Sequence, residues 1–241
     1  MTALMKRAER AEAELFHHLV TSAPATLKAR LGIATGRVGG GVLTSVRHDI
    51  TGYWSNAIGL GINEPVTAEV IDRVIDFFTA ENNPGALLHL APSLLPTGWL
   101  AIVERHALRK NGARYQHACA IGEFRATTST DLRIGRDADA LEWTRFTMRG
   151  FGMPDDVFGA MLSPGYSSDN VQLFAAWDGD HTVGTAAQFI WEDIAVLSSG
   201  VTLPGYRKRG AQSAGRYPSS RCCPRRMPLA GHSNRKAARR P

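Results

Sequence analysis

The stretch that decides the fold runs from Val201 to Ala214 and reads VTLPGYRKRGAQSA. A run of β-branched and apolar residues leads into a turn rich in basic residues, and small residues able to begin a helix follow. Backbone N–H groups at a helix start have no partner within the helix and favour negative charge. Gly210 lets a phosphate approach the main chain closely, and the basic residues 207–209 add charge at the rim. The stretch therefore predicts an anion site, with a solvated basic loop as the alternative.

The residues before this stretch predict one strand, two helices and three strands in succession. Asp139 followed by Glu142 is typical of a capping box that opens a helix, and Asp178 with Gly179 between two apolar runs indicates a hairpin. We expect strands at residues 132–134, 171–177, 182–190 and 194–202, and helices that begin at residue 139 and cover residues 154–162.

The first half of the chain predicts a second, weaker alternation of helices and strands. The apolar period indicates helices at residues 2–20, 67–78 and 94–108, the last broken near residues 96–98, and short strands at residues 86–91 and 115–121. The glycines of residues 32–63 favour turns between strands over a phosphate loop, because no Lys followed by Ser or Thr stands at the required offset. Together the two halves predict a mixed α/β layer structure.

The net charge of +6 belongs to the last 27 residues. This segment carries eight of the 28 basic residues and none of the 22 acidic ones, so the first 214 residues have a net charge of −2. The basic balance therefore says little about the partners of the folded part.

The composition argues against several classes of protein. The body contains Cys119 alone, which excludes a disulfide framework and leaves no metal site to expect; a buried inert thiol is favoured over a nucleophile. No apolar run of about 18 residues indicates a membrane span, and no signal segment opens the chain. We expect a soluble, cytoplasmic protein with no membrane partner.

The 201–214 stretch resembles the signature of the GNAT superfamily of acetyl-CoA-dependent N-acyltransferases. That signature has Arg or Gln, two residues, Gly, one residue, then Gly or Ala, and Arg207, Gly210 and Gln212 stand at those positions. Pro204 and Tyr206 precede them as in the family, whereas Gln212 replaces the usual small residue. The order of elements from residue 130 to residue 214 is also similar to the family.

The resemblance implies a fold and a division of the chain. The implied fold is α/β of the α+β type, a mixed and largely antiparallel GNAT-like sheet flanked by helices, in a second copy that is incomplete at its C-terminus. Residues 1–125 would form a degenerate GNAT-like domain, residues 126–214 the N-terminal part of an acyltransferase domain, and residues 215–241 a disordered tail rich in Pro and Arg. The threonine-rich residues 125–130 are the expected linker.

The resemblance also implies a site and a cosubstrate, acetyl-CoA. The main chain of Val201, Thr202 and Leu203 would pair with the pantetheine arm, and the backbone amides of the loop would hold the diphosphate. The implied binding residues in that loop are Arg207, Lys208, Arg209, Gly210, Ala211, Gln212 and Ser213. The acceptor, a small-molecule or peptide amine, must lose a proton before it attacks. Glu192 and Asp193 are the nearest carboxylates in sequence, with a plain turn as the alternative for both.

Other interpretations stay open for the whole chain. The helical and strand patterns stop at residue 215, which is typical of a truncated or frameshifted acyltransferase, and such a chain would lack part of the cofactor cleft. A basic arm that binds nucleic acid is the rival interpretation of the tail. A noncatalytic CoA-binding or scaffold protein and a homo-oligomer are also open, and the sequence does not identify the acceptor.

Overall fold

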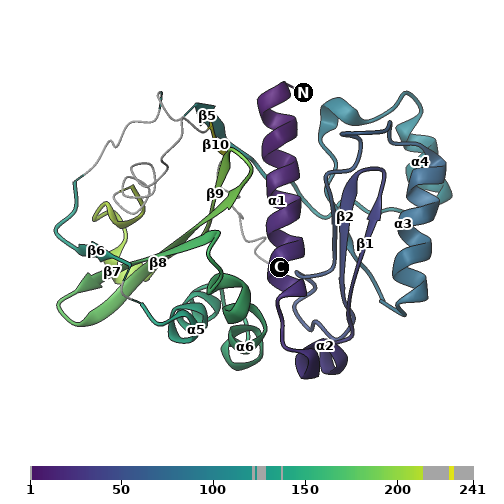
Figure 1. The fold of residues 1–241 in the computed structure, drawn as a ribbon. Helices are drawn as coiled ribbons and strands as arrows, with labels where there is room; N and C mark the ends of the chain where they lie inside the picture. The colour runs from purple at the N-terminus through teal and green to yellow at the C-terminus, as the bar shows by residue number, and fades with distance from the viewer. Residues whose placement is uncertain (1, 121–122, 124–128, 137, 214–227, 231–241) are drawn as a thin grey trace.

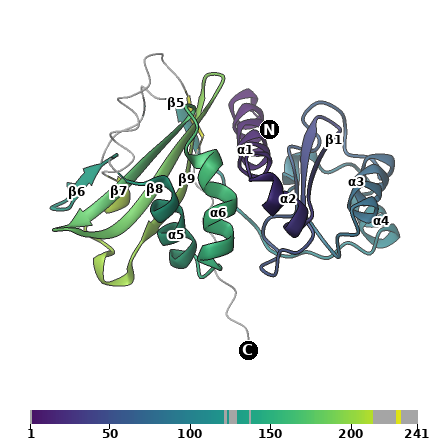
Figure 2. The same ribbon diagram turned by 60° about the horizontal axis from the view of Figure 1, so that its bottom comes forward.

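A computed structural model describes residues 2–120, 123, 129–136, 138–213 and 228–230. Its central feature is helix α1 (Ala3–Thr21), which lies between two β-sheets in both views (Figures 1 and 2). Thr2 caps this helix, because its hydroxyl accepts the N–H of Met5 at 3.3 Å. Its apolar residues recur every three or four positions and are buried, as the sequence predicts.

The first sheet has four strands in the order β1-β2-β3-β4, and only β3 and β4 run parallel. The strands are β1 (Ile33–Val38), β2 (Gly41–Val46), β3 (Asn56–Ile58) and β4 (Leu87–Leu88). The accompanying helices are α2 (Ala25–Leu31), α3 (Ala68–Ala80), η1 (Pro92–Leu94) and α4 (Trp99–Arg105). In Figure 1, α3 and α4 cover the face of the sheet that is turned away from α1. The glycines at residues 39–40 form the turn between β1 and β2, in agreement with the sequence.

The second sheet has six strands in the order β5-β10-β9-β8-β7-β6. The strands are β5 (Ala118–Ala120), β6 (Arg133–Gly135), β7 (Val171–Asp178), β8 (His181–Trp191), β9 (Ile194–Thr202) and β10 (Pro228–Ala230). All neighbours are antiparallel except β9 and β10. The mixed α/β class and the largely antiparallel second sheet confirm the prediction.

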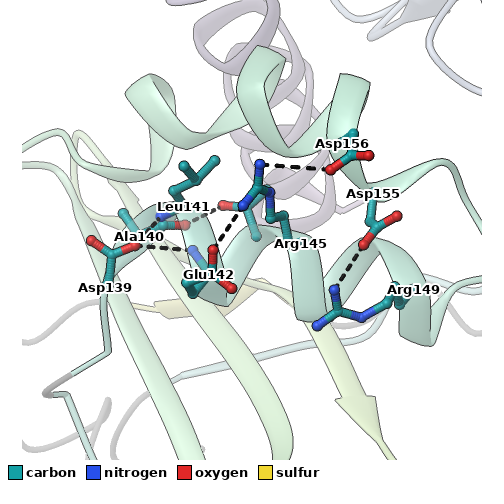
Figure 3. A network of polar contacts seen from close by, with 9 residues as sticks. Asp139, Ala140, Leu141, Glu142, Arg145, Arg149, Asp155 and Asp156 are labelled. Carbon is teal, nitrogen blue, oxygen red and sulfur yellow. Dashed lines mark hydrogen bonds and ion pairs between the residues drawn. The ribbon is translucent and has the colours of Figure 1, made fainter.

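Helices α5 (Ala140–Gly150) and α6 (Asp155–Tyr166) pack against each other and against the second sheet. Figure 3 shows the polar contacts that join their exposed faces: Arg149 pairs with Asp155 at 2.7 Å, and Arg145 lies 3.6 Å from Asp156. Asp139 caps α5 by accepting two backbone N–H groups, but Glu142 pairs with Arg145 and does not close the expected capping box. These exposed pairs orient the two helices and add little stability.

Helix α6 continues beyond its expected end. The sequence predicts an end at residue 162 because Pro164 and Gly165 follow, yet the helix includes both and reaches Tyr166. A β-carbon added to Gly165 would lie 3.1 Å from the Cα of Leu19, so the absent side chain lets α6 pack closely on α1. Tertiary packing thus extends the helix past a proline that local rules treat as a stop.

One hydrophobic core joins the two halves of the chain. It contains Leu19 of α1, Trp54 of the first half, and Trp143 and Phe189 of the second. A separate cluster around Val70 and Ile71 lies between α3 and the first sheet. The helices of the described residues include no candidate for a membrane span.

The basic tail enters the structure at three residues. Pro228–Ala230 form β10, between β9 and β5, where the sequence predicts no strand. The other residues from 214 to 241 and most of the 125–130 linker lie outside the described residues. The predicted disorder of the tail therefore concerns residues that the structure does not describe. β5, placed in the first half by its sequence position, pairs within the second sheet.

Candidate active site

A cleft of about 760 Å³ lies between α1, β9 and the loop that follows β9. Eight of the residues predicted to bind the cosubstrate line it: Val201, Thr202, Arg207, Lys208, Gly210, Ala211, Gln212 and Ser213. Leu203 and Arg209 belong to the same segment but do not line the cleft. The structure therefore brings most of the predicted anion site to one concave surface.

A β-bulge in β9 shapes the floor of this cleft. Thr185 pairs with Val201 and Ala187 with Ser198, so β9 carries one more residue than β8 between these pairs. Ser199, within the bulge, has a φ of 56°, and its hydroxyl shares a 2.6 Å hydrogen bond with the hydroxyl of buried Tyr166. Burial raises the pKa of Tyr166, so this hydroxyl stays protonated. A bulge bends a strand and interrupts its regular hydrogen bonds to the neighbouring strand. The bulge in β9 lies beside the cleft.

The loop after β9 is built for a close approach to its main chain. It starts with a 3₁₀ turn, η3 (Pro204–Tyr206), and residues 211–213 are helical. Gly210 has a φ of 78°, and a β-carbon there would lie 2.4 Å from the carbonyl oxygen of Ser129. Lys208 also has a positive φ, of 67°. Only glycine fits at position 210, because the main chain packs there against the carbonyl of Ser129. The close approach of a phosphate to Gly210 stays a prediction.

Arg209 holds the loop in place and does not add charge to the cleft. Its guanidinium donates to Asp131 and, at 2.9 Å, to Asp178, so it connects the loop to the start of β6 and the end of β7. This contact lowers the pKa of the Asp131 carboxyl. Arg207 and Lys208 are the two basic side chains of the loop that line the cleft.

Glu192 lies outside the cleft. It occupies the turn between β8 and β9 with a φ of 50°, its side chain is exposed, and the neighbouring Asp193 pairs with Arg7 of α1. Glu192 and Asp193 are therefore residues of a plain turn, which is the alternative that the sequence leaves open for both.

The carboxylate that lines the cleft is Glu12 of α1, which the sequence analysis missed. It pairs with Arg114 at 3.0 Å and accepts the side-chain N–H of Gln116 at 3.0 Å, and its side chain is 13% exposed. Burial raises its pKa against the opposing effect of Arg114. Glu9, one turn earlier, has a pKa raised to about 7 by burial and by the charge of Glu12. Glu9 and Glu12 directly follow Ala8 and Ala11, which are buried. This placement is the only sign in the sequence that the two carboxylates lie near the core.

Aromatic side chains from the first half form part of the same wall. Phe16, Tyr53 and Trp54 line the cleft, and Trp54 is 3% exposed. The indole N–H of Trp54 and the hydroxyl of Ser198 are buried and have no hydrogen-bond partner among the described residues. Such orphaned groups are expected where a ligand completes the site.

The described residues contain no group of three or more His, Cys, Asp or Glu side chains placed to hold a metal ion. The cleft combines a main-chain edge, a glycine-containing loop with two cations, and a buried carboxylate.

Comparison with solved structures defines the fold. The chain is similar to a GCN5-related N-acetyltransferase from Kribbella flavida, with a TM-score of 0.58 and 14% identity over 94% of this chain and 85% of that one. It is also similar to a tandem GNAT protein from the clavulanic acid biosynthesis pathway (TM-score 0.54, 11% identity, 96% and 88% covered). A GCN5-related N-acetyltransferase from Sphaerobacter thermophilus gives a TM-score of 0.51 at 15% identity, with 98% and 87% covered.

The chain therefore has the fold of the GNAT superfamily, as the sequence predicts. No protein-family model and no curated protein matches the sequence. The likeness is one of fold, and it extends over both halves of the chain.

Proposed function

We propose that this protein transfers an acetyl group from acetyl-CoA to an amine. The observation that carries the proposal is the single cleft that brings together the bulged strand β9 and the loop at residues 207–213. An extended pantetheine arm suits the main-chain edge of a strand, and a diphosphate suits backbone N–H groups at a helix start flanked by cations.

The residues present fit such a cosubstrate. Gly210 lines the cleft without a side chain, and Arg207 and Lys208 supply positive charge along it. Ser198 offers a buried hydroxyl without a partner among the described residues. The thioester supplies an activated acyl group, so the protein has to position it, exclude water and remove a proton from the amine.

Calorimetric titration of acetyl-CoA into the full chain tests the cosubstrate, with Gly210→Ala as the probe. We expect saturable binding by the native chain and an affinity at least about tenfold lower in the variant, roughly 1.4 kcal/mol. The reason is the strained φ of 78° together with the 2.4 Å approach to the Ser129 carbonyl.

Gly205→Ala is the matched control, because a β-carbon at Gly205 meets nothing within 4 Å. It should bind acetyl-CoA as the native chain does. A folded native chain that does not bind acetyl-CoA contradicts the proposal. Saturable binding without release of the CoA thiol in the presence of any amine would indicate a noncatalytic CoA-binding protein.

A further inference from the structure

The wall of the cleft that faces β9 comes from the first half of the chain. Glu12, Phe16 and Trp54 line it, together with Arg114. Arg114 and Gln116 come just before β5, which is separated from β9 by β10. β10 pairs with Ala195 and Val196 of β9, while residues 196–202 of β9 line the cleft. A molecule in the cleft is thus held between the cosubstrate strand and the first half.

The charge on this wall favours a cation. Glu12 lines the wall and pairs with the guanidinium of Arg114, and Glu9, behind it, lies one helical turn earlier and interacts with both charges. When both carboxylates are ionised, the cluster keeps one negative charge in a poorly hydrated place. A protonated amine is attracted to such a charge, and the attraction is strong where water is excluded.

The rest of the wall favours an apolar body on that amine. Phe16, Tyr53 and Trp54 line this wall and give it an apolar, aromatic surface, against which a planar group of the ligand would pack. The indole N–H of Trp54 is buried and has no hydrogen-bond partner in the part of the chain that the structure describes, so an oxygen on the ligand would satisfy it. A small aromatic amine that also carries a hydroxyl satisfies both features.

We propose that Glu12 is the base that takes the proton from the acceptor, and that the acceptor is a small primary amine on an aromatic body, bound by the first half of the chain. This inference rests on the proposed acetyl transfer. It gives the first half a direct part in the reaction, because its α1 supplies the carboxylate and its aromatic residues bind the substrate.

The step balances as follows. The ammonium group gives one proton to the Glu12 carboxylate, and the freed nitrogen lone pair forms a bond with the thioester carbonyl carbon. The carbon–sulfur bond breaks, its electron pair leaves with sulfur, and the second proton of the nitrogen passes to that sulfur. CoA thiol, the N-acetyl product and one proton on Glu12 result, and Glu12 returns that proton to water.

The surroundings of Glu12 set the pH at which it acts. Burial raises the pKa of Glu12, Arg114 lowers it, and the side-chain N–H of Gln116 donates to the carboxylate. Because the pKa of Glu12 is raised, the base loses its proton at a higher pH than an ordinary glutamate does. We therefore expect kcat/KM to rise with pH, with a midpoint above the ordinary pKa of a glutamate.

The test uses the full chain, acetyl-CoA and tyramine, with release of the CoA thiol as the readout. Glu12→Gln should lower kcat by about 100-fold and remove the acid limb of the pH profile, with acetyl-CoA binding retained. Glu14→Gln, on the same helix but paired with Arg37, is the matched control and should leave kcat and the profile unchanged. Glu12→Asp should recover part of the rate. Putrescine, which has no ring, should be at least tenfold poorer than tyramine in kcat/KM.

Three results would overturn the inference while the proposed cosubstrate stands. The first is acetyl-CoA binding without turnover of tyramine, and the second is a Glu12→Gln variant with native kcat and pH profile. The third is equal use of putrescine and tyramine. A native chain that fails to bind acetyl-CoA refutes the proposed function instead, so the two failures are distinct.

Discussion

Glu9 shows how a single residue connects burial to pH-dependent stability. Its pKa of about 7 in the folded chain lies above the ordinary 4.5, so the folded state binds this proton more tightly than the unfolded state does. The stability that depends on this proton is present below about pH 4.5 and is lost as the pH rises through 7. The fold therefore tolerates an unfavourable charge at neutral pH, next to the carboxylate that we propose as the base.

Replacing Glu9 by Gln should stabilise the chain at pH 8 and have little effect at pH 4. The expected gain in the free energy of unfolding at pH 8 is on the order of 2–3 kcal/mol, from the shift in pKa. Denaturant titrations at the two pH values measure it.

Glu14→Gln should have the opposite effect on the free energy of unfolding at pH 8, which it should lower. Hydrogen bonds from Arg37 lower the pKa of Glu14, so the native carboxylate stabilises the fold above its ordinary pKa and that contribution is lost in the variant at pH 8.

A Glu9→Gln variant that is destabilised equally at both pH values would show that the Glu9 proton is not coupled to folding.

At the scale of elements, a hydrogen bond from a side chain of α6 stabilises the bulge in β9. Tyr166→Phe removes the buried hydroxyl that meets Ser199, which has a positive φ in the bulge. We expect a loss of about 1–2 kcal/mol in the free energy of unfolding, because one buried partner loses its hydrogen bond. We also expect weaker acetyl-CoA binding, because Tyr166 and Ser199 both line the cleft.

Denaturant unfolding and calorimetry measure the two effects. Tyr115→Phe is the control, since Tyr115 is 68% exposed, and it should change neither quantity. Lower stability with native acetyl-CoA affinity in Tyr166→Phe would separate the bulge from the binding site.

Local sequence signals predict the elements whose ends are fixed by local chemistry. The cap at Asp139 is confirmed, and so is the Gly179 turn between β7 and β8. The loop at residues 207–213 was predicted for the same reason, because its glycine and its basic residues are neighbours in sequence. The extension of α6 through Pro164 was not predicted, because it depends on contact with α1.

The opposite wall of the cleft could not be predicted from local patterns. Glu12, Trp54 and Arg114 are far from one another and from residue 210 in the sequence, and only the tertiary fold brings them to one cavity. Glu12 also has the spacing of a charge on the exposed face of an amphipathic helix, and burial alone distinguishes it. β10 could not be predicted either, because the residues next to it in the sequence do not show the alternation of apolar and polar residues that is typical of a strand.

At the scale of the molecule, α1 joins the two sheets into one cooperative unit. Leu19 is 3% exposed and belongs to the core cluster that both halves share. Leu19→Ala should therefore lower the free energy of unfolding by about 2–5 kcal/mol and expose both sheets together.

Hydrogen exchange followed by mass spectrometry on peptides of β2 and β8 tests this expectation. Both should lose protection to the same extent in Leu19→Ala. Leu100→Ala, at a residue 80% exposed, should stay within about 0.5 kcal/mol of the native chain. Loss of protection in only one sheet would mean that the halves fold independently.

The pairing of β5 with β10 limits how the chain can be divided and recombined. β5 precedes the expected boundary at residue 125 but belongs to the second sheet. Of two fragments cut at that boundary, the first would hold β5, which the second sheet needs, so the fragments should reassemble by addition of this strand when mixed, as in a split-protein reporter. A chimera that exchanges the second half alone would replace β10 but keep the old β5, and the graft point would have to move upstream of residue 118.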